Sequence, residues 1–355
     1  MKKLERYDGL DILKTICAFM VVFAHAPIVG TCGEYGNVLA RVSVPLFFMI
    51  SGFFFDSVVS NKKEWKHVKK LLMLLLLSNL TYFLFNTVKS LILGNVDSFF
   101  HKLFSAKTLV RFFFLNVSPF SSHLWYLGAI LYVYVLAVCY GKNPSIQQIL
   151  GRMLPILIPV LLLGDLILGT YSLLLFGREF PYVIVRNFLF VGIPYFMIGV
   201  IMKNKEESLD QIRKHGILMV SLAFLFCLTT ILERTILVMN DLKSMREHYI
   251  STTLLSLVLF IIFSDCSWND GRLKLVKLIG RKHSLMIYVI HPLFITLIRA
   301  IMIRMGINDL YLFVRPVIVF IVSILFSVIF YFTLNLTKHR SCKDNSITEI
   351  GDEVE

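Results

Sequence analysis

The chain has 355 residues, of which 57% are hydrophobic and only 17% are charged, and it carries a net charge of +13. Soluble globular domains use about 25% charged residues, so this composition excludes a water-soluble protein. The basic residues lie in short segments between apolar runs, which is typical of a polytopic membrane protein and not of a nucleic-acid-binding protein. We therefore expect the lipid bilayer as a partner and no nucleic acid.

The cysteines indicate neither a disulfide framework nor a metal site. No CxxC pair occurs among Cys17, Cys32, Cys139, Cys227, Cys266 and Cys342. Structural zinc sites and disulfide-rich domains need closely spaced cysteines, so we expect no metal. No signal peptide is expected before the first apolar run, because that run is too long and no small-residue cleavage site follows it.

The apolar runs predict an all-α, polytopic helix bundle, since about 20 apolar residues cross the ~30 Å hydrocarbon core of a bilayer. About ten spans are expected, in one membrane domain over residues 1–336, followed by a polar, disordered tail over 337–355. The expected spans are 10–29, 42–59, 69–93, 121–140, 153–175, 187–202, 217–238, 250–264, 283–303 and 311–336.

The loop charges predict that both termini are cytoplasmic. About 22 Lys and Arg residues lie in one set of loops and about 9 in the opposite set, and the richer side is normally cytoplasmic. His25 then lies toward the outer face and Lys14 toward the inner face. The longest outer connection, residues 94–120, is aromatic and weakly basic, which suits a helix in the membrane interface.

The first span carries three groups that can be charged, Asp11, Lys14 and His25. Lys14 and His25 are eleven residues apart and so point within ~20° of each other on a helix, and Asp11 falls within ~60° of both. A polar stripe inside a membrane is costly unless it faces a protein interior or a water-filled cavity. The pattern therefore predicts a buried site on this helix.

Two features of the second and third spans each have two interpretations. Ser51 and Gly52 lie in mid-membrane, where small residues let either a neighbouring helix or a ligand approach the backbone. Lys66, Lys69 and Lys70 flank the start of the third span. They are either topology signals that contact anionic lipids or ligands for phosphate groups.

Polar and aromatic residues also gather at the outer ends of the fourth and sixth spans. His123 and Trp125 fit the aromatic belt of the membrane interface, but His123 at the depth of His25 also fits a shared outward cavity. Arg186 and Asn187 lie at the same level. Arg186 could pair with a carboxylate such as Glu179 or Asp165, or hold an anionic or hydroxyl-rich ligand.

The ninth span places Ser284, Tyr288 and His291 on one helix face, because they are spaced four and three residues apart. His291 directly precedes Pro292 near mid-membrane. An ionisable residue at this depth is a functional candidate, with a structural alternative in which the imidazole hydrogen-bonds a carbonyl that the proline leaves free.

The sequence contains no GxxxxGK[ST], HExxH, GxSxG or GxGxxG motif. Phosphate-loop, zinc-protease, α/β-hydrolase and dinucleotide-binding chemistries are therefore excluded in their common forms. Histidine, lysine and hydroxyl chemistry inside a helical bundle remains.

Four segments together resemble the acyltransferase-3 family of bacterial integral membrane proteins: RYDGLDILKTICAFMVVFAH at 6–25, VPLFFMISGFFF at 44–55, HLWYL at 123–127 and GRKHSLMIYVIHPLF at 280–294. The resemblance implies a ten-helix, multi-pass protein of the bacterial inner (cell) membrane. Such a protein transfers an acyl group, usually acetyl, from cytoplasmic acyl-CoA to a hydroxyl of a surface or exported glycan. A basic residue and a histidine eleven positions apart on the first helix mark the family.

The resemblance also implies roles for particular residues. His25 takes the catalytic histidine position, as general base for the acceptor hydroxyl, with Lys14 and Asp11 beside it on the first span. Lys14, Tyr288 or His291 would stabilise the oxyanion. Acetyl-CoA, as co-substrate, would contact the residues Lys66, Lys69, Lys70, Ser51, Tyr288 and His291. A glycan or lipid-linked saccharide would contact the residues His123, Trp125, Arg186 and Asn187.

The chain departs from the family pattern at its basic residues. Lys14 replaces the usual arginine, and Lys66 with Lys69 replaces the RxxR pair before the third helix. Lysine keeps the charge but loses the planar fork that binds a phosphate or carboxylate through two bonds. A homo-oligomer is compatible with the sequence, which does not determine the oligomeric state.

A second function remains open. HLWYL at 123–127 and RNFLFVGIPYFMIGV at 186–200 also resemble the membrane half of vancomycin-resistance serine racemases. That resemblance implies a transporter or exporter of an amino acid or glycan on the same fold. An acyltransferase should bind or hydrolyse acyl-CoA, whereas a transporter should bind its solute without it.

Overall fold

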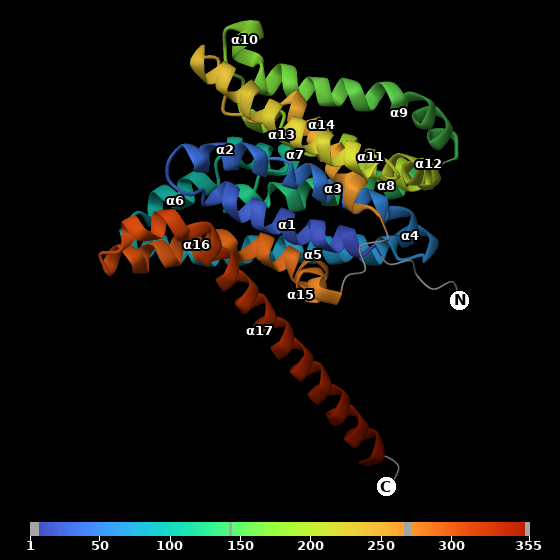
Figure 1. Cartoon of the computed structure of the whole chain (residues 1–355). Helices are drawn as coiled ribbons and strands as arrows, with labels where there is room; N and C mark the ends of the chain where they lie inside the picture. Colours follow the sequence, from blue (N-terminus) through green and yellow to red (C-terminus); the bar gives the residue numbers. More distant parts are fainter. Residues whose placement is uncertain (1–6, 142–143, 266–270, 352–355) are drawn as a thin grey trace. The chain divides into compact units, whose positions relative to one another are not determined.

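The computed structural model describes residues 7–141, 144–265 and 271–351, and every regular element in these ranges is a helix (Figure 1). The chain divides into two compact units: the first comprises Met1–Leu10 and Asn37–Trp268, and the second Asp11–Gly36 and Asn269–Glu355. Helices α1 (Asp8–His25) and α2 (Thr31–Ala40) contribute residues to both units. The all-α bundle expected from the apolar runs is confirmed.

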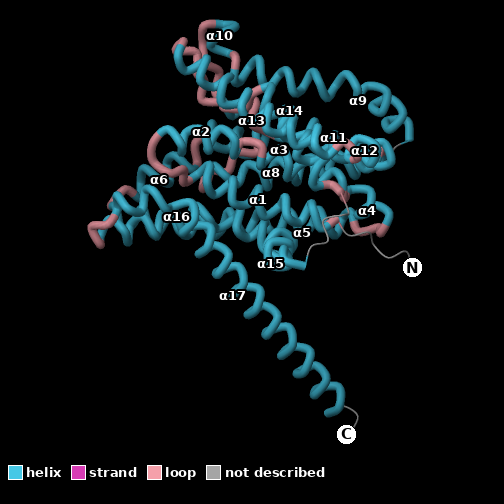
Figure 2. The backbone as a smooth tube through the Cα atoms, in the orientation of Figure 1, coloured by secondary structure: helices cyan, strands magenta, loops and turns pink. Residues whose placement is uncertain are grey.

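The first unit contains most of the helices. In chain order they are α3 (Ser43–Phe53), α4 (Phe55–Ser60), α5 (Glu64–Leu93), α6 (Val96–Leu103), α7 (Ala106–Leu115), η1 (Ser122–Leu124), α8 (Trp125–Gly141), α9 (Pro144–Asp165), η2 (Leu166–Thr170), α10 (Ser172–Phe176), η3 (Tyr182–Ile184), η4 (Phe188–Gly192), α11 (Ile193–Asn204), α12 (Glu206–Arg213), α13 (Gly216–Met239) and α14 (Ile250–Phe263). Figure 2 shows how short loops connect them.

Helices α3 and α11 cross with their backbones in direct contact. A Cβ atom added at Gly52 would lie 1.9 Å from the carbonyl oxygen of Phe196, and one added at Gly199 would lie 2.0 Å from that of Met49. Only glycine allows two helices to approach this closely. This reciprocal pair of glycines fixes the crossing at the centre of the first unit.

The expected connection at 94–120 folds into two short helices, α6 and α7, instead of one. Ser105 separates them and caps α7, since its Oγ accepts a hydrogen bond from the N–H of Thr108. The helix ends at Asn116 in the left-handed conformation (φ 50°). Phe104, Phe113 and Phe114 are exposed, as expected for helices whose apolar faces meet lipid.

The second unit contains the end of the chain and most of α1. Its helices include η5 (Gly271–Leu273), α15 (Lys274–Leu278), η6 (Ile279–His283), α16 (Ser284–Arg304) and α17 (Asn308–Gly351). Helix α17 continues through residues 337–351, where the sequence predicts a disordered tail. No proline or glycine interrupts this segment before Gly351, and extending a formed helix costs little. The single domain over 1–336 stays a prediction.

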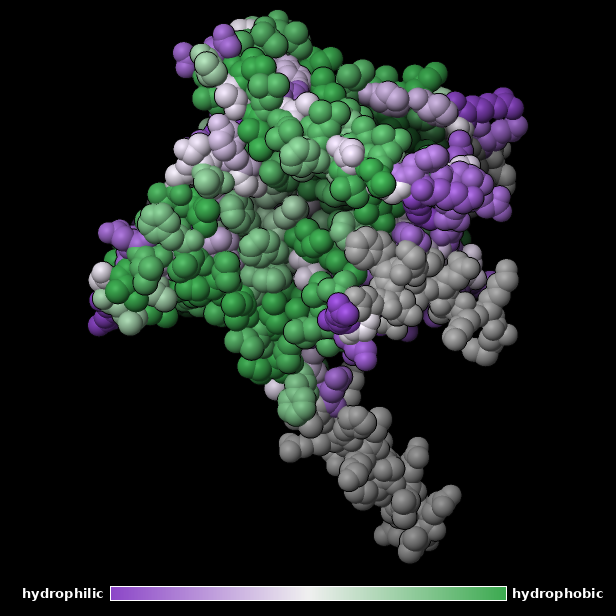
Figure 3. Space-filling view, viewed as in Figure 1, coloured by the Kyte–Doolittle hydropathy of each residue, from purple (hydrophilic) through white to green (hydrophobic). Residues whose placement is uncertain are grey.

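Within the described residues, seven helices are long and apolar enough to cross a membrane, or eight if the pair Phe188–Asn204 and Glu206–Arg213, bent by 85°, is one span. Two of the ten expected spans, the first and the eighth, are not among these long apolar helices. Helix α1 carries Asp8, Asp11 and Lys14, and α14 has only 14 residues. Large apolar side chains cover much of the visible surface (Figure 3), as in a protein solvated by lipid.

Candidate functional site

Within the second unit, helix α1 lies against the segment that leads into α16. A Cβ atom at Gly280 would lie 1.8 Å from the carbonyl oxygen of Asp11, so the two backbones touch. The hydroxyl of Thr15 donates to the carbonyl of Val276 at 2.6 Å. These contacts fix the first span, which carries His25, against the ninth span, which carries His291.

Asp11 connects two cations at this contact. Its carboxylate lies 3.2 Å from Lys14 Nζ and 3.1 Å from Arg281 Nε, one oxygen to each. The expected stripe of Asp11 and Lys14 is therefore a paired charge cluster. Arg281 completes it. The sequence analysis missed this role, because a basic residue at a helix end is normally a topology signal.

The rings of His25 and His291 lie 5.1 Å apart, centroid to centroid, with a 46° angle between their planes. His25, the last residue of α1, is exposed, and His291 is completely buried. The second unit thus brings together two histidines separated by more than 260 positions in the chain. One ring is open to the surroundings and the other is enclosed by protein.

His291 also satisfies a backbone group that Pro292 leaves free. Proline has no N–H to bond the carbonyl of Tyr288, four residues before it. His291 Nδ1 lies 2.8 Å from this oxygen and 3.1 Å from that of Ile287. Because carbonyls only accept, Nδ1 carries the hydrogen, which assigns the lone pair of the neutral ring to Nε2. The structural alternative for His291 is therefore realised, beside its contact with His25.

Lys14 and His25 share a face of α1 but lie far apart along it. Eleven residues of continuous helix separate their Cα atoms by about 16 Å. The two side chains are therefore too far apart to act on the same atom. Tyr288, which is buried one turn from His291 with its ring centroid 6.2 Å away, is nearer to the histidines.

In the first unit, Ser51 and Gly52 belong to the α3–α11 crossing. The Ser51 hydroxyl donates to the carbonyl of Phe47 at 2.8 Å, and the Tyr134 hydroxyl donates to the Ser51 carbonyl at 3.3 Å. The packing interpretation accounts for both residues. Three further candidates, the side chains of Lys66, Lys69 and Lys70, are exposed on the first turns of α5.

The candidates at the predicted outer ends of the fourth and sixth spans make local contacts. His123 is buried, with Nδ1 2.7 Å from the Ser121 hydroxyl. The Asn187 side chain accepts from the N–H groups that begin η4. The Arg186 guanidinium lies over the rings of Tyr182 at 4.4 Å and Trp125 at 5.4 Å.

The two carboxylates proposed as partners of Arg186 bond elsewhere. Asp165 is fully buried and receives two hydrogen bonds from Arg246, at 2.9 and 2.8 Å, and lies 2.6 Å from His248 Nδ1. Glu179 accepts from the backbone N–H of Met245. Asp165 thus pairs with Arg246 and His248, which the segment after α13 supplies, while the alternative in which Arg186 holds an anionic or hydroxyl-rich ligand stays a prediction.

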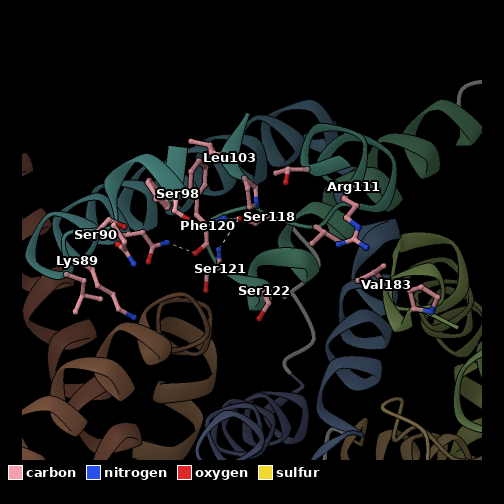
Figure 4. Close-up of a pocket in the computed structure, with 18 of the residues that line it drawn as sticks. Lys89, Ser90, Ser98, Leu103, Arg111, Ser118, Phe120, Ser121, Ser122 and Val183 are labelled. Atoms are coloured by element: carbon pink, nitrogen blue, oxygen red, sulfur yellow. Dashed lines mark hydrogen bonds between the residues drawn. The ribbon is translucent and has the colours of Figure 1, made fainter. Parts of the chain in front are cut away.

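Next to these residues lies a polar cavity of ≈ 710 Å³, which we call the serine pocket. It lies among α5, α6, α7 and the segment that follows α7. Its charged lining residues are Lys89 and Arg111, and Figure 4 shows the serines between these two side chains. Its polar lining residues are Asn86, Ser90, Asn95, Ser98, Thr108, Ser118, Ser121, Ser122 and Tyr182. Ser121 and Tyr182 contact the candidates His123 and Arg186, which border the pocket without lining it.

Three asparagines hold the wall of the serine pocket in place. Asn79 accepts from the Ser118 hydroxyl at 2.7 Å, and Asn86 donates to the carbonyl of Phe120 at 2.7 Å. Asn116 donates to the carbonyl of Trp125 and accepts from the N–H of Phe188. The sequence analysis missed these residues. For Asn79 and Asn86 the signal was a polar residue inside the expected span 69–93, where such residues are rare unless they are bonded.

The helical, multi-pass architecture defines a polytopic membrane protein, and comparison with known proteins places it in a family. A family model described as an acyltransferase domain matches residues 7–332. The chain therefore belongs to the acyltransferase-3 family of membrane proteins.

The comparison with curated proteins adds one short similarity. An amino-acid racemase from Enterococcus faecalis is 40% identical over 62 residues, which cover 16% of this chain and 9% of that protein. The similarity therefore spans a small part of the racemase, and that protein's activity is not carried over from it. No solved structure matches the chain.

Proposed function

We propose that the protein transfers an acyl group, most simply acetyl, from cytoplasmic acyl-CoA to a hydroxyl of a cell-surface or exported glycan. The observation that carries this proposal is the contact between exposed His25 and buried His291. An imidazole that a substrate can reach suits proton transfer near neutral pH. Its partner ring is held rigidly by the Tyr288 carbonyl.

His25 acts as the general base in this proposal. It takes the proton of the acceptor hydroxyl while the hydroxyl oxygen bonds to the thioester carbonyl carbon. The carbon–sulfur bond then breaks, and the imidazolium returns the proton to the leaving thiolate of CoA. No covalent acyl-enzyme is needed, so atoms and charge balance with one base.

Tyr288 is the best of the three expected oxyanion donors. A phenol donates a hydrogen bond while neutral, whereas His291, with Nδ1–H committed to a carbonyl, donates from Nε2 only when protonated. Lys14 lies about 16 Å along the helix from His25. We assign Lys14 to the donor side, with Asp11 and Arg281 holding its position.

The donor would meet cations at the cytoplasmic face. Lys66, Lys69 and Lys70 are exposed at the start of α5 and would attract the phosphates of acyl-CoA. Ser51 donates its hydroxyl hydrogen to the carbonyl of Phe47, and its hydroxyl oxygen could still accept a bond from the donor. We propose the bacterial inner membrane as the location, with both termini cytoplasmic.

The acceptor would bind at the opposite, outer face. His123 and Arg186 border the serine pocket, Trp125 lies against Arg186, and Asn187 follows Arg186 in the chain. The hydroxyl and amide groups of the pocket suit a saccharide. In this arrangement the four residues shape the pocket, while its lining residues contact the acceptor.

The test is His25→Ala in purified full-length protein supplied with acetyl-CoA and bacterial surface glycan. General-base catalysis contributes about 10²–10⁴-fold, so acetyl transfer should fall by at least about 100-fold. His215→Ala, at an exposed histidine between α12 and α13, should leave the rate unchanged. Transfer at the wild-type rate in His25→Ala would reject the catalytic role. A protein that binds glycan but neither binds nor hydrolyses acetyl-CoA would favour transport instead.

A further inference from the structure

The serine pocket adjoins a second, apolar cavity of ≈ 430 Å³. The two cavities share four lining residues, Leu103, Thr108, Pro119 and Phe120. One cavity is rich in hydroxyl and amide groups, whereas the other is lined almost entirely by apolar side chains. A ligand that fills both must itself have a polar end and an apolar end.

The polar end must tolerate or carry negative charge. Lys89 of α5 and Arg111 of α7 line the serine pocket, and the lining residues that the structure describes include no carboxylate. Asp97 lies on α6 but is outside this lining. Two cations without a lining anion favour a phosphate, which arginine and lysine both bind.

The size and chemistry of the serine pocket also favour a sugar. Its ≈ 710 Å³ lies in the range of pockets for drug-sized ligands and exceeds what a glycerol headgroup fills. Asn95, Ser98 and Ser122 have exposed side chains there, which can bond several hydroxyls at once. Ser118 and Ser121 are instead used to hold the pocket wall and His123.

The apolar cavity opens where a lipid chain could enter. Its lining includes Phe104, which directly follows α6, and Leu109 and Phe113 of α7, and all three side chains are exposed. A hydrocarbon chain seated there would cover them and gain the free energy of apolar burial.

We infer that the two cavities bind one lipid-linked sugar phosphate, with the sugar phosphate in the serine pocket and the hydrocarbon chain in the apolar cavity. The inference rests on the proposed function: the acceptor sugar of the acyl transfer would reach the protein attached to this lipid. Arg111, on the helix that also lines the apolar cavity, contacts the phosphate. Lys89, at the other end of the serine pocket, and the hydroxyl and amide groups between them contact the sugar.

The inference is tested by binding, without acyl-CoA and therefore without turnover. Delipidated full-length protein in detergent is titrated with a polyprenyl-phosphate-linked hexose and the complex is counted by native mass spectrometry. The double variant Lys89→Gln/Arg111→Gln should weaken binding by about tenfold or more, since it removes both charge-assisted contacts. Lys107→Gln is the matched control, because Lys107 is exposed on α7 and outside the lining, and should bind as wild type.

Two further ligands test separately whether the hydrocarbon chain and the sugar each contribute to binding. Glucose 1-phosphate lacks the chain and should bind at least about tenfold more weakly than the lipid-linked hexose. Phosphatidylglycerol has an anionic head and chains but no sugar, and should also bind more weakly. Equal binding of either ligand, or wild-type affinity in the double variant, overturns the inference.

Different results would reject the proposed catalytic role of His25 and the proposed ligand of the two cavities. His25→Ala should bind the lipid-linked hexose normally, because His25 is not among the residues that line either cavity. Wild-type acyl transfer in His25→Ala with intact lipid binding would sink the catalytic proposal alone. Loss of transfer in His25→Ala, together with unchanged lipid affinity in the Lys89→Gln/Arg111→Gln protein, would sink the pocket assignment alone.

Discussion

His291 has two roles that the structure separates. Its Nδ1–H caps the Tyr288 carbonyl that Pro292 cannot bond, and its ring contacts His25. The first role concerns the stability of α16 and the second concerns the proposed chemistry. A substitution can therefore affect folding and activity independently.

Replacing His291 by Leu should destabilise the protein by about 1–3 kcal/mol, the usual cost of leaving a buried polar group unbonded. Adding Pro292→Ala supplies a backbone N–H in reach of the Tyr288 carbonyl, so the double variant should regain most of that loss. Thermal unfolding in detergent measures both. A double variant no more stable than His291→Leu would contradict this account of the hydrogen bond.

At the scale of helices, the α3–α11 crossing depends on glycine. A Cβ atom would lie 1.9 Å from a backbone carbonyl oxygen at Gly52 and 2.0 Å from one at Gly199, whereas ordinary contacts are 3.4–4 Å. Separating two helices there would disturb the packing of Phe196 and of every residue around it. The crossing therefore leaves no room for a side chain at either glycine.

Gly52→Ala should destabilise the protein by more than about 4 kcal/mol, since backbone atoms cannot move aside as a flexible side chain can. Gly151→Ala in α9 is the control. The nearest atom to its added Cβ is the Tyr140 hydroxyl at 3.8 Å, so it should be neutral or stabilise by up to about 1 kcal/mol. Yield of monodisperse protein and its unfolding temperature distinguish them. A Gly52→Ala protein that behaves as wild type would disprove the close approach.

The connection between α13 and α14 is fixed by a cluster of charges around Glu247. Its carboxylate lies 3.0 Å from Arg41 and 3.0 Å from Lys243. Burial alone would raise the pKa of Glu247, but Arg41 and Lys243 hold this pKa below its ordinary value of 4.5. The cluster thus contributes stability only while the carboxylate is ionised.

The sign of the pH dependence follows from that lowered pKa. The contribution of Glu247 is complete above pH 4.5 and is lost as the pH falls through the lower pKa of the folded state. Unfolding temperatures between pH 7 and pH 3 should therefore fall less steeply in Glu247→Gln than in the wild type. An identical slope in both proteins would show that Glu247 does not contribute to acid sensitivity.

For the whole molecule, the orientation in the membrane stays a prediction, and two native cysteines can test it. Cys32 follows the outer end of the first span, and Cys139 lies near the inner end of the fourth; both are exposed. A membrane-impermeant maleimide should label Cys32 in intact cells and Cys139 only after permeabilisation. Single-cysteine variants assign each signal. Labelling in the opposite order would invert the topology inferred from the loop charges.

The apolar runs were enough to predict an all-α membrane bundle, because crossing a bilayer demands long helices whose backbone bonds are internal. The same reasoning singled out His25 and His291, since ionisable groups are costly in lipid. It overestimated the apolar length of the first and eighth expected spans. Charge on α1 and the 14 residues of α14 account for that difference.

Contacts between distant segments could not be predicted. Helical periodicity gives the direction of a side chain about its own axis but not which helix faces it. The contact of His25 with His291, the choice of Arg246 and not Arg186 as partner of Asp165, and the asparagines around the serine pocket all depend on such neighbours. Sequence determined which groups need partners in an apolar environment; only tertiary packing decided which partners they found, because bonds and cavities form between surfaces that lie far apart in the chain.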